Sequence, residues 1–140
     1  MKKTFIAMLG TCFTLFISCQ GEQLPIKDEL VKQNILGKWM LVKHKEETYS
    51  AANTIAYKNE RAGDKSDSII FKPNGKLYTY SDIDGSEIID YEVIDDQTLR
   101  VENEHWKIVT LTATQLDLLS EETDPVTKEK DVASASFKRP

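Results

Sequence analysis

The stretch Asn34–Val42, which reads N-I-L-G-K-W-M-L-V, decides the fold of this chain. Gly37 lets the backbone bend sharply, and Trp39 supplies a large apolar anchor for one end of a core. A glycine two residues before a tryptophan therefore indicates where a coil becomes the first strand of a sheet. Side chains alternate along a strand, so this one has two faces. The predicted faces are Trp39, Leu41 and Lys43 on one side and Met40, Val42 and His44 on the other.

The residues before this strand predict a short helix at Lys27–Gln33. Asp28 and Glu29 stand where the N-terminus of a helix favours acidic side chains, and apolar residues follow them. We expect this helix to plug one end of a sheet structure.

Length and composition indicate one globular domain. The chain has 140 residues, of which 40% are hydrophobic and 29% charged. Without residues 1–18, which contain Lys2 and Lys3, 16 basic side chains face 23 acidic ones, a net charge of −7. This acidic balance argues against a nucleic-acid partner and against electrostatic docking to anionic lipid. Cys12 and Cys19 both fall early, so no disulfide framework is expected in the domain.

The first residues indicate an export signal. Lys2 and Lys3 precede an apolar run, from about Phe5 to Ile17, that is too short to span a bilayer. The sequence Phe16-Ile17-Ser18-Cys19 resembles the lipobox of bacterial lipoproteins, in which the cysteine is lipidated and becomes the first residue of the mature protein. The resemblance implies that Cys19 carries acyl chains such as palmitate. Burial of these chains at about 0.8 kcal/mol per methylene would anchor the protein in a membrane.

The residues after Cys19 bear on the destination of the protein. The residue after the cysteine is Gln20 rather than aspartate, which by resemblance to Gram-negative sorting rules implies the outer membrane. Both the periplasmic and the surface-facing leaflet of that membrane fit this sequence. Residues 20–26 contain Gly21 and Pro25 and read as a tether. We therefore expect a lipoprotein signal peptide at 1–18, a lipidated anchor and tether at 19–26 and a barrel domain at 27–140.

Strand signals become regular from Asp67 onward. Short apolar or alternating runs are separated by turns such as Lys72–Lys76, where proline presets the turn and glycine accepts a positive φ. Together with the strand around Trp39 these runs make eight strands. The other seven are Ser68–Phe71, Leu77–Tyr80, Glu87–Ile94, Thr98–Glu102, His105–Thr110, Gln115–Leu119 and Val132–Lys138.

Eight antiparallel strands in sequence order leave two open edges unless the last strand pairs with the first. We therefore expect an all-β, up-and-down barrel in which the final strand lies beside Trp39. A barrel of this size holds either a filled core or one small ligand. The polar stretch His44–Ser66 is predicted to be a long connection, and its Tyr49, Ile55 and Tyr57 either close over a cavity as a lid or pin a surface loop.

Several short motifs in the same order resemble the lipocalin-like domain of small Gram-negative lipoproteins, over roughly Ile35 to Phe137. The motifs are Gly37-Lys38-Trp39 after a short helix, the Ile70–Gly75 hairpin, Tyr91 before the Asp95-Asp96 turn, Leu99, and Ile108-x-x-Leu111-Thr112. The resemblance implies that Gly37 and Trp39 lie at the closed end of the barrel. It also implies that Arg139, after the last strand, packs over the indole, a contact worth about 0.5–2 kcal/mol.

The candidate ligand-binding residues are mostly aromatic. Those expected to point inward are Trp39, Phe71, Tyr91, Trp106 and Phe137. Tyr78 and Tyr80 share one face of a strand and Leu77 and Thr79 the other, so the tyrosines either line a cavity or form an exposed aromatic patch. Ordinary cross-strand packing is a third reading.

The inventory of reactive side chains predicts a binding protein and not an enzyme. His44 and His105 stand alone, without the spacing of a zinc site, and we expect neither a metal nor a cofactor. The leading hypothesis is a small hydrophobic or amphipathic ligand in the barrel mouth. The alternative is a non-catalytic module that docks to a cell-envelope protein complex.

Overall fold

The computed structural model of the chain describes residues 27–83 and 85–140. The predicted signal peptide, the lipobox with Cys19 and the tether lie outside the described residues. One helix and nine strands make up the described part. They are α1 (Lys27–Ile35), β1 (Gly37–Tyr49), β2 (Ile55–Ala62), β3 (Ser68–Phe71), β4 (Lys76–Ser81), β5 (Gly85–Val93), β6 (Thr98–Val101), β7 (Glu104–Leu111), β8 (Gln115–Thr123) and β9 (Lys130–Lys138).

Eight of the described strands close into an antiparallel barrel, as predicted. From β3 to β9 each strand pairs with the next along the chain, and β1 pairs with β3 on one side and with β9 on the other. Leu41 lies opposite Phe137, so the last strand does lie beside the Trp39 strand. Closure leaves no open edge in this ring of strands, which is the physical reason for the arrangement.

The ninth strand corrects the prediction of a long connection at His44–Ser66. This segment forms a β-hairpin, in which β1 continues to Tyr49 and β2 pairs with its second half from Lys43↔Ala62 to Tyr49↔Ile55. The strands were missed because both faces carry charged or polar residues, so no apolar alternation marks them. Ion pairs such as Lys43 to Glu60, 2.6 Å, replace hydrophobic cross-strand contacts.

The alternation of β1 reverses at Val42. Opposite β9, Leu41 faces Phe137 and Lys43 faces Ser136, so Val42 is an extra residue in a β-bulge. Trp39 and Leu41 point into the core, but Lys43 points outward and His44 inward. The predicted grouping of Lys43 with Trp39, and of His44 with the outer face, was therefore wrong, since strict alternation does not anticipate a bulge.

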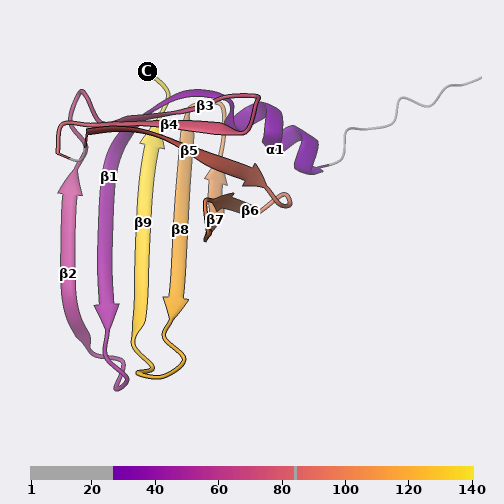
Figure 1. Cartoon of the computed structure of the whole chain (residues 1–140). Coiled ribbons are helices and arrows are strands. Elements are labelled where there is room, and N and C mark those ends of the chain that lie inside the picture. The colour runs from indigo at the N-terminus through magenta and orange to yellow at the C-terminus, as the bar shows by residue number, and fades with distance from the viewer. Residues whose placement is uncertain (1–26, 84) are drawn as a thin grey trace, which may run out of the picture.

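The end of the barrel where β1 begins is closed. Helix α1 lies against this end in Figure 1, and its last residue, Ile35, is fully buried beside Trp39. The Arg139 guanidinium stacks on the Trp39 ring at 4.0 Å, which confirms the predicted contact. Gly37 has φ of +100°, a backbone conformation that favours glycine. A Cβ there would lie 2.7 Å from Arg139 Nη1, so the guanidinium would have to move.

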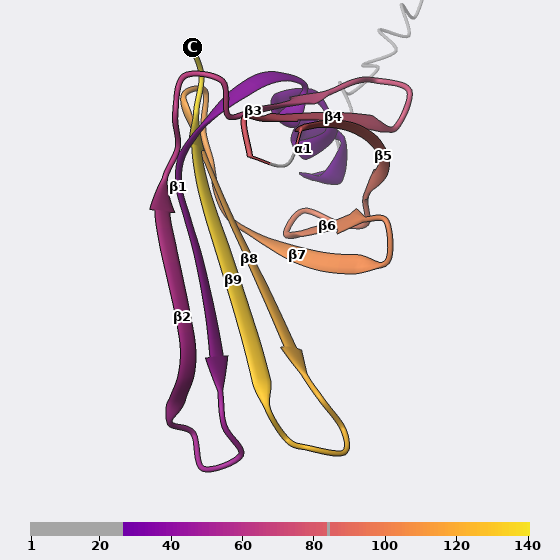
Figure 2. The same ribbon diagram turned by 60° about the vertical axis from the view of Figure 1, so that its left-hand side comes forward.

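The opposite end is extended on one side. In Figures 1 and 2 the long strands β2, β1, β9 and β8 run side by side well beyond the level of β6 and β7. The inner face of the barrel therefore continues onto the inner face of this four-stranded sheet. The strand β2 pairs with β1 alone among the described strands.

Candidate functional site

A cavity of about 360 Å³ occupies the part of the barrel away from α1. Every strand of the ring contributes at least one side chain to its wall, from Leu41 on β1 round to Phe137 on β9. The apolar wall consists of Leu41, Ile69, Phe71, Leu77, Ile89, Leu99, Val101, Trp106, Leu118, Ala135 and Phe137. A largely apolar hollow of this volume is typical of small-molecule sites, at the lower end of their size range.

Four of the aromatic residues that we predicted as ligand contacts come together here. They are Phe71, Tyr80, Trp106 and Phe137. Phe71 and Phe137 are buried in the wall, whereas Trp106 is half-buried and Tyr80 reaches the surface. Thr79 and Leu77 face the cavity, so their strand turns Tyr78 outward, and Tyr80 reaches the wall from the strand end.

Trp39 and Tyr91 belong to the closed end and do not line this cavity. Trp39 is fully buried, and its indole N–H donates a 2.7 Å hydrogen bond to the Ile35 carbonyl. The ring of Tyr91 meets that of Phe71 edge to face, and its hydroxyl donates to the Lys72 carbonyl at 2.7 Å. Both aromatic side chains therefore contribute packing and hydrogen bonds at the closed end of the barrel.

The remaining aromatic candidates lie outside the cavity wall. The Lys72 ammonium lies 5.6 Å from the centre of the Tyr78 ring, on the outer surface. On β1, Tyr49 donates a hydrogen bond to Glu47, and that carboxylate raises the pKa of the Tyr49 phenol. Ile55 and Tyr57 sit on the exposed β2, so the three residues of the predicted lid are strand residues beyond the mouth.

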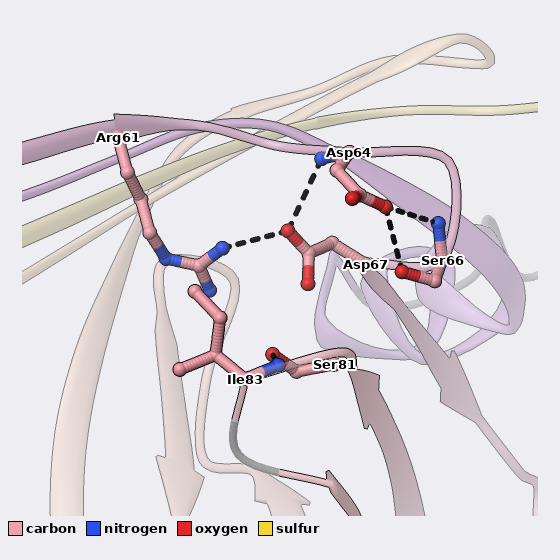
Figure 3. Close-up of polar contacts among 6 residues, drawn as sticks. All are labelled: Arg61, Asp64, Ser66, Asp67, Ser81 and Ile83. Carbon is pink, nitrogen blue, oxygen red and sulfur yellow. Dashed lines mark hydrogen bonds and ion pairs between the residues drawn. The ribbon is translucent and has the colours of Figure 1, made fainter.

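A part-buried ion pair, between Arg61 and Asp67, lies on the polar side of the cavity. Asp67 accepts hydrogen bonds from Arg61 Nη1 at 2.6 Å and from the Asp64 backbone N–H at 3.1 Å (Figure 3). Burial disfavours the charged form of Asp67, but these bonds and the Ser81 hydroxyl outweigh it and lower the pKa of Asp67 below its ordinary value. The pair ties β2 to the segment before β3.

The mouth of the cavity is lined by polar groups. His44, Ser68 and Thr79 come from strands of the ring. Glu102 lies in the turn between β6 and β7, and Glu104 is the first residue of β7. Glu104 also lines a second hollow of about 280 Å³ on the inner face of the long strands. That hollow is polar, with Glu46, Thr48, Glu122 and Asp131 among its residues.

The acidic groups of the mouth were missed by sequence reasoning. Glu104 shares a face with Trp106, two residues on, but the predicted strand began at His105 and left it out. The Arg61–Asp67 pair carried no signal, because Arg61 fell in the segment that was predicted to be a connection. The alternation from Trp106 back to Glu104 was the one pattern that pointed to the mouth.

Within residues 27–83 and 85–140, no three histidine, cysteine, aspartate or glutamate side chains are grouped as metal ligands would be. No helix in these ranges is both long and apolar enough to cross a membrane.

The chain matches no model of a known protein family, and no curated protein is similar to it in sequence.

Proposed function

We propose that this chain is a lipid-anchored lipoprotein of the outer membrane whose lipocalin-like barrel binds a small hydrophobic or amphipathic molecule. The observation that supports binding is the apolar cavity of about 360 Å³, walled by all eight strands of the ring in the described part of the chain. In this hollow Trp106, Ile89 and Val101 are only partly buried, so each has apolar surface without a packing partner. A ligand would supply those contacts and gain the hydrophobic free energy of the buried area.

The geometry favours binding over catalysis. The titratable groups at the cavity are His44, Tyr80 and three carboxylates. One of the carboxylates, Asp67, is held by Arg61. His44 pairs only loosely, with Glu46 at 3.8 Å. A general base with a nucleophile in hydrogen-bond reach, which acyl or glycosyl transfer needs, is not among these pairs.

The test of ligand binding is native mass spectrometry of residues 20–140, purified gently from cells of the organism that makes the protein. We expect a reproducible extra mass that disappears on denaturation. The variant Ala135→Phe should lose this mass, because Ala135 lines the cavity and a phenyl ring would fill it. The matched control is Ser134→Phe, which places the same ring on the outer face of β9. A clean apo mass for wild type under these conditions would count against the proposal.

Anchoring is tested separately. The proposal predicts that the chain sediments with membranes and that Cys19→Ala releases it into the soluble fraction. A variant that stays in the membrane pellet would contradict lipidation at Cys19, without bearing on the cavity.

One observation favours the alternative, a module that docks to an envelope protein complex. Within the described residues, β2 pairs on one side only, and the sheet that it borders projects beyond the ring. A partner strand added at such an edge is a recurrent mode of recognition. Cross-linking in intact cells tests it, with a photoreactive residue at Asn59 on β2 and a control at Lys107 on β7.

A further inference from the structure

The charged groups around the cavity are of one sign. Its wall carries Asp67, Glu102 and Glu104, but no lysine or arginine is among the described residues that line it. Asp67 is neutralised by Arg61, 2.6 Å away. In the described part of the chain, Glu102 and Glu104 have no ion-pair or hydrogen-bond partner for their carboxylates. The mouth is therefore an apolar hollow with two uncompensated negative charges.

The negative potential continues onto the inner face of the long strands. The second hollow shares Glu104 with the cavity and adds Glu46, Glu122 and Asp131. Of these, Asp131 accepts a hydrogen bond from Thr48 and Glu46 lies near His44, but Glu122 has no partner within residues 27–83 and 85–140. The apolar cavity and this acidic approach are independent features that meet at Glu104.

The outer face of the same strands is different. There the carboxylates are matched by lysines: Glu60 by Lys43 at 2.6 Å and Glu121 by Lys130 at 2.8 Å. The strands thus place lysines on the face away from the mouth and leave the inner carboxylates uncompensated. An acidic chain in general would not produce this division between two faces.

We propose that the cavity takes a cationic amphiphile, a molecule with an apolar tail and an amine or quaternary ammonium head. This inference rests on the proposed ligand-binding function and specifies its chemistry. The tail lies against Ile69, Ile89 and Val101, apolar residues of the cavity wall that are partly exposed. The head remains at the mouth near Glu102 and Glu104. Trp106, half-buried at the same mouth, offers a ring face that attracts a cation. A carboxylate head, as in a fatty acid, would meet like charges instead.

The experiment compares three probes with the same decyl tail: decyltrimethylammonium, decanol and decanoate. Each is titrated below its micelle concentration into the mature chain, purified from its own cells and held in lipid nanodiscs, with empty nanodiscs as the reference. Tryptophan emission reports binding, since Trp106 lines the cavity. We expect decyltrimethylammonium to bind about ten-fold more tightly than decanoate, as one or two partly screened charges would produce, with decanol between them.

A matched pair of variants identifies the carboxylates responsible. Glu102→Gln with Glu104→Gln removes two negative charges from the mouth and should abolish the preference for decyltrimethylammonium over decanoate. Glu60→Gln with Glu121→Gln removes two charges from the outer face and should leave the preference intact. An equal loss in both variants would mean that only net charge matters and would overturn the assignment.

The remaining outcomes separate the two proposals. If decanol and decanoate bind as well as the cation, the cavity binds ligands but the inference about their charge is wrong. If none of the three binds above the empty-nanodisc reference, both the inference and the ligand-binding function are contradicted.

Discussion

Arg139 connects the end of the chain to its beginning. Its guanidinium stacks on Trp39, and its two terminal nitrogens donate to the carbonyls of Leu36 and Asn34, each at 2.7 Å. Asn34 lies in the last turn of α1 and Leu36 follows the helix, so their carbonyls have no partner within the helix. One side chain therefore caps the helix and covers the indole.

Replacement of Arg139 should be costly. We expect Arg139→Ala to lower the free energy of unfolding by about 2–3 kcal/mol, from the lost stacking and two charge-assisted hydrogen bonds. Arg139→Lys should recover part of this, since an ammonium cannot stack as a plane or donate in two fixed directions. Urea unfolding followed by tryptophan emission measures both. The control is Lys138→Ala, which removes the same charge from an exposed neighbour and should change little.

Asp67 should make stability depend on pH. Its pKa is lowered in the folded state, so its contribution is fully present above the ordinary value of 3.8 and is lost as the pH falls through the folded value. At neutral pH, Asp67→Asn should cost about 3 kcal/mol, because Arg61 loses its partner. The difference in free energy of unfolding between wild type and Asp67→Asn should then decrease as the pH falls below 3.8, the ordinary pKa of aspartate.

Equilibrium unfolding of both proteins between neutral and acid pH checks this expectation. Asp90→Asn is the control, because Asp90 pairs with Lys76 on the surface and its loss should cost less than about 0.5 kcal/mol. A constant gap between wild type and Asp67→Asn at every pH would show that the pair does not titrate as its geometry predicts.

Among the elements, β2 should be the least stable strand. All of its residues are exposed except Arg61, which is half-buried, and it pairs with β1 alone among the described strands. Amides in Ile55–Ala62 should therefore exchange with deuterium about 100-fold faster, or more, than those at Leu116 and Leu118 in the core. Hydrogen exchange with mass spectrometry resolves the two segments. Equal protection would mean that β2 unfolds only with the barrel.

The elements that sequence reasoning found and missed differ in one physical property. Strands such as Leu77–Tyr80 and Thr98–Glu102 bury one face, so alternating apolar residues marked them and their turns. β2 buries neither face, and its Glu60 pairs with Lys43 across the hairpin instead. For the aromatic candidates, alternation predicted that Trp39, Tyr91 and Trp106 point inward. It did not predict which of them would lie at the closed end and which at the cavity.

On the scale of the whole molecule, the barrel has a filled end and a hollow end, and each holds one tryptophan. Trp39 is fully buried at the closed end, whereas Trp106 lines the cavity. Acrylamide should therefore quench wild-type emission in two components. In Trp106→Phe the accessible component should disappear and leave the protected emission of Trp39. If the variant is quenched as readily as wild type, the closed end is open to solvent and the assignment of the two ends is wrong.

Closure itself could be predicted from the sequence because eight strands in order leave no other way to remove both edges. The hollow could not, since whether a barrel is filled depends on the depth and rotamers of a few side chains. Phe71 and Phe137 lie in the wall and Ala135 is small, so together they leave space that a larger residue at position 135 would take.

The extra residue at Val42 determines where this chain tolerates a change in length. Because the pairing with β9 passes directly from Leu41↔Phe137 to Lys43↔Ser136, removal of Val42 would restore a regular ladder and turn no other side chain over. Removal of a residue between Lys43 and Tyr49 would instead exchange the two faces for the rest of β1. If the residue removed is His44, Lys45 would take its place at the mouth and would partly offset the negative charges of Glu102 and Glu104. The ligand preference of the barrel is thus coupled to the spacing of its first strand.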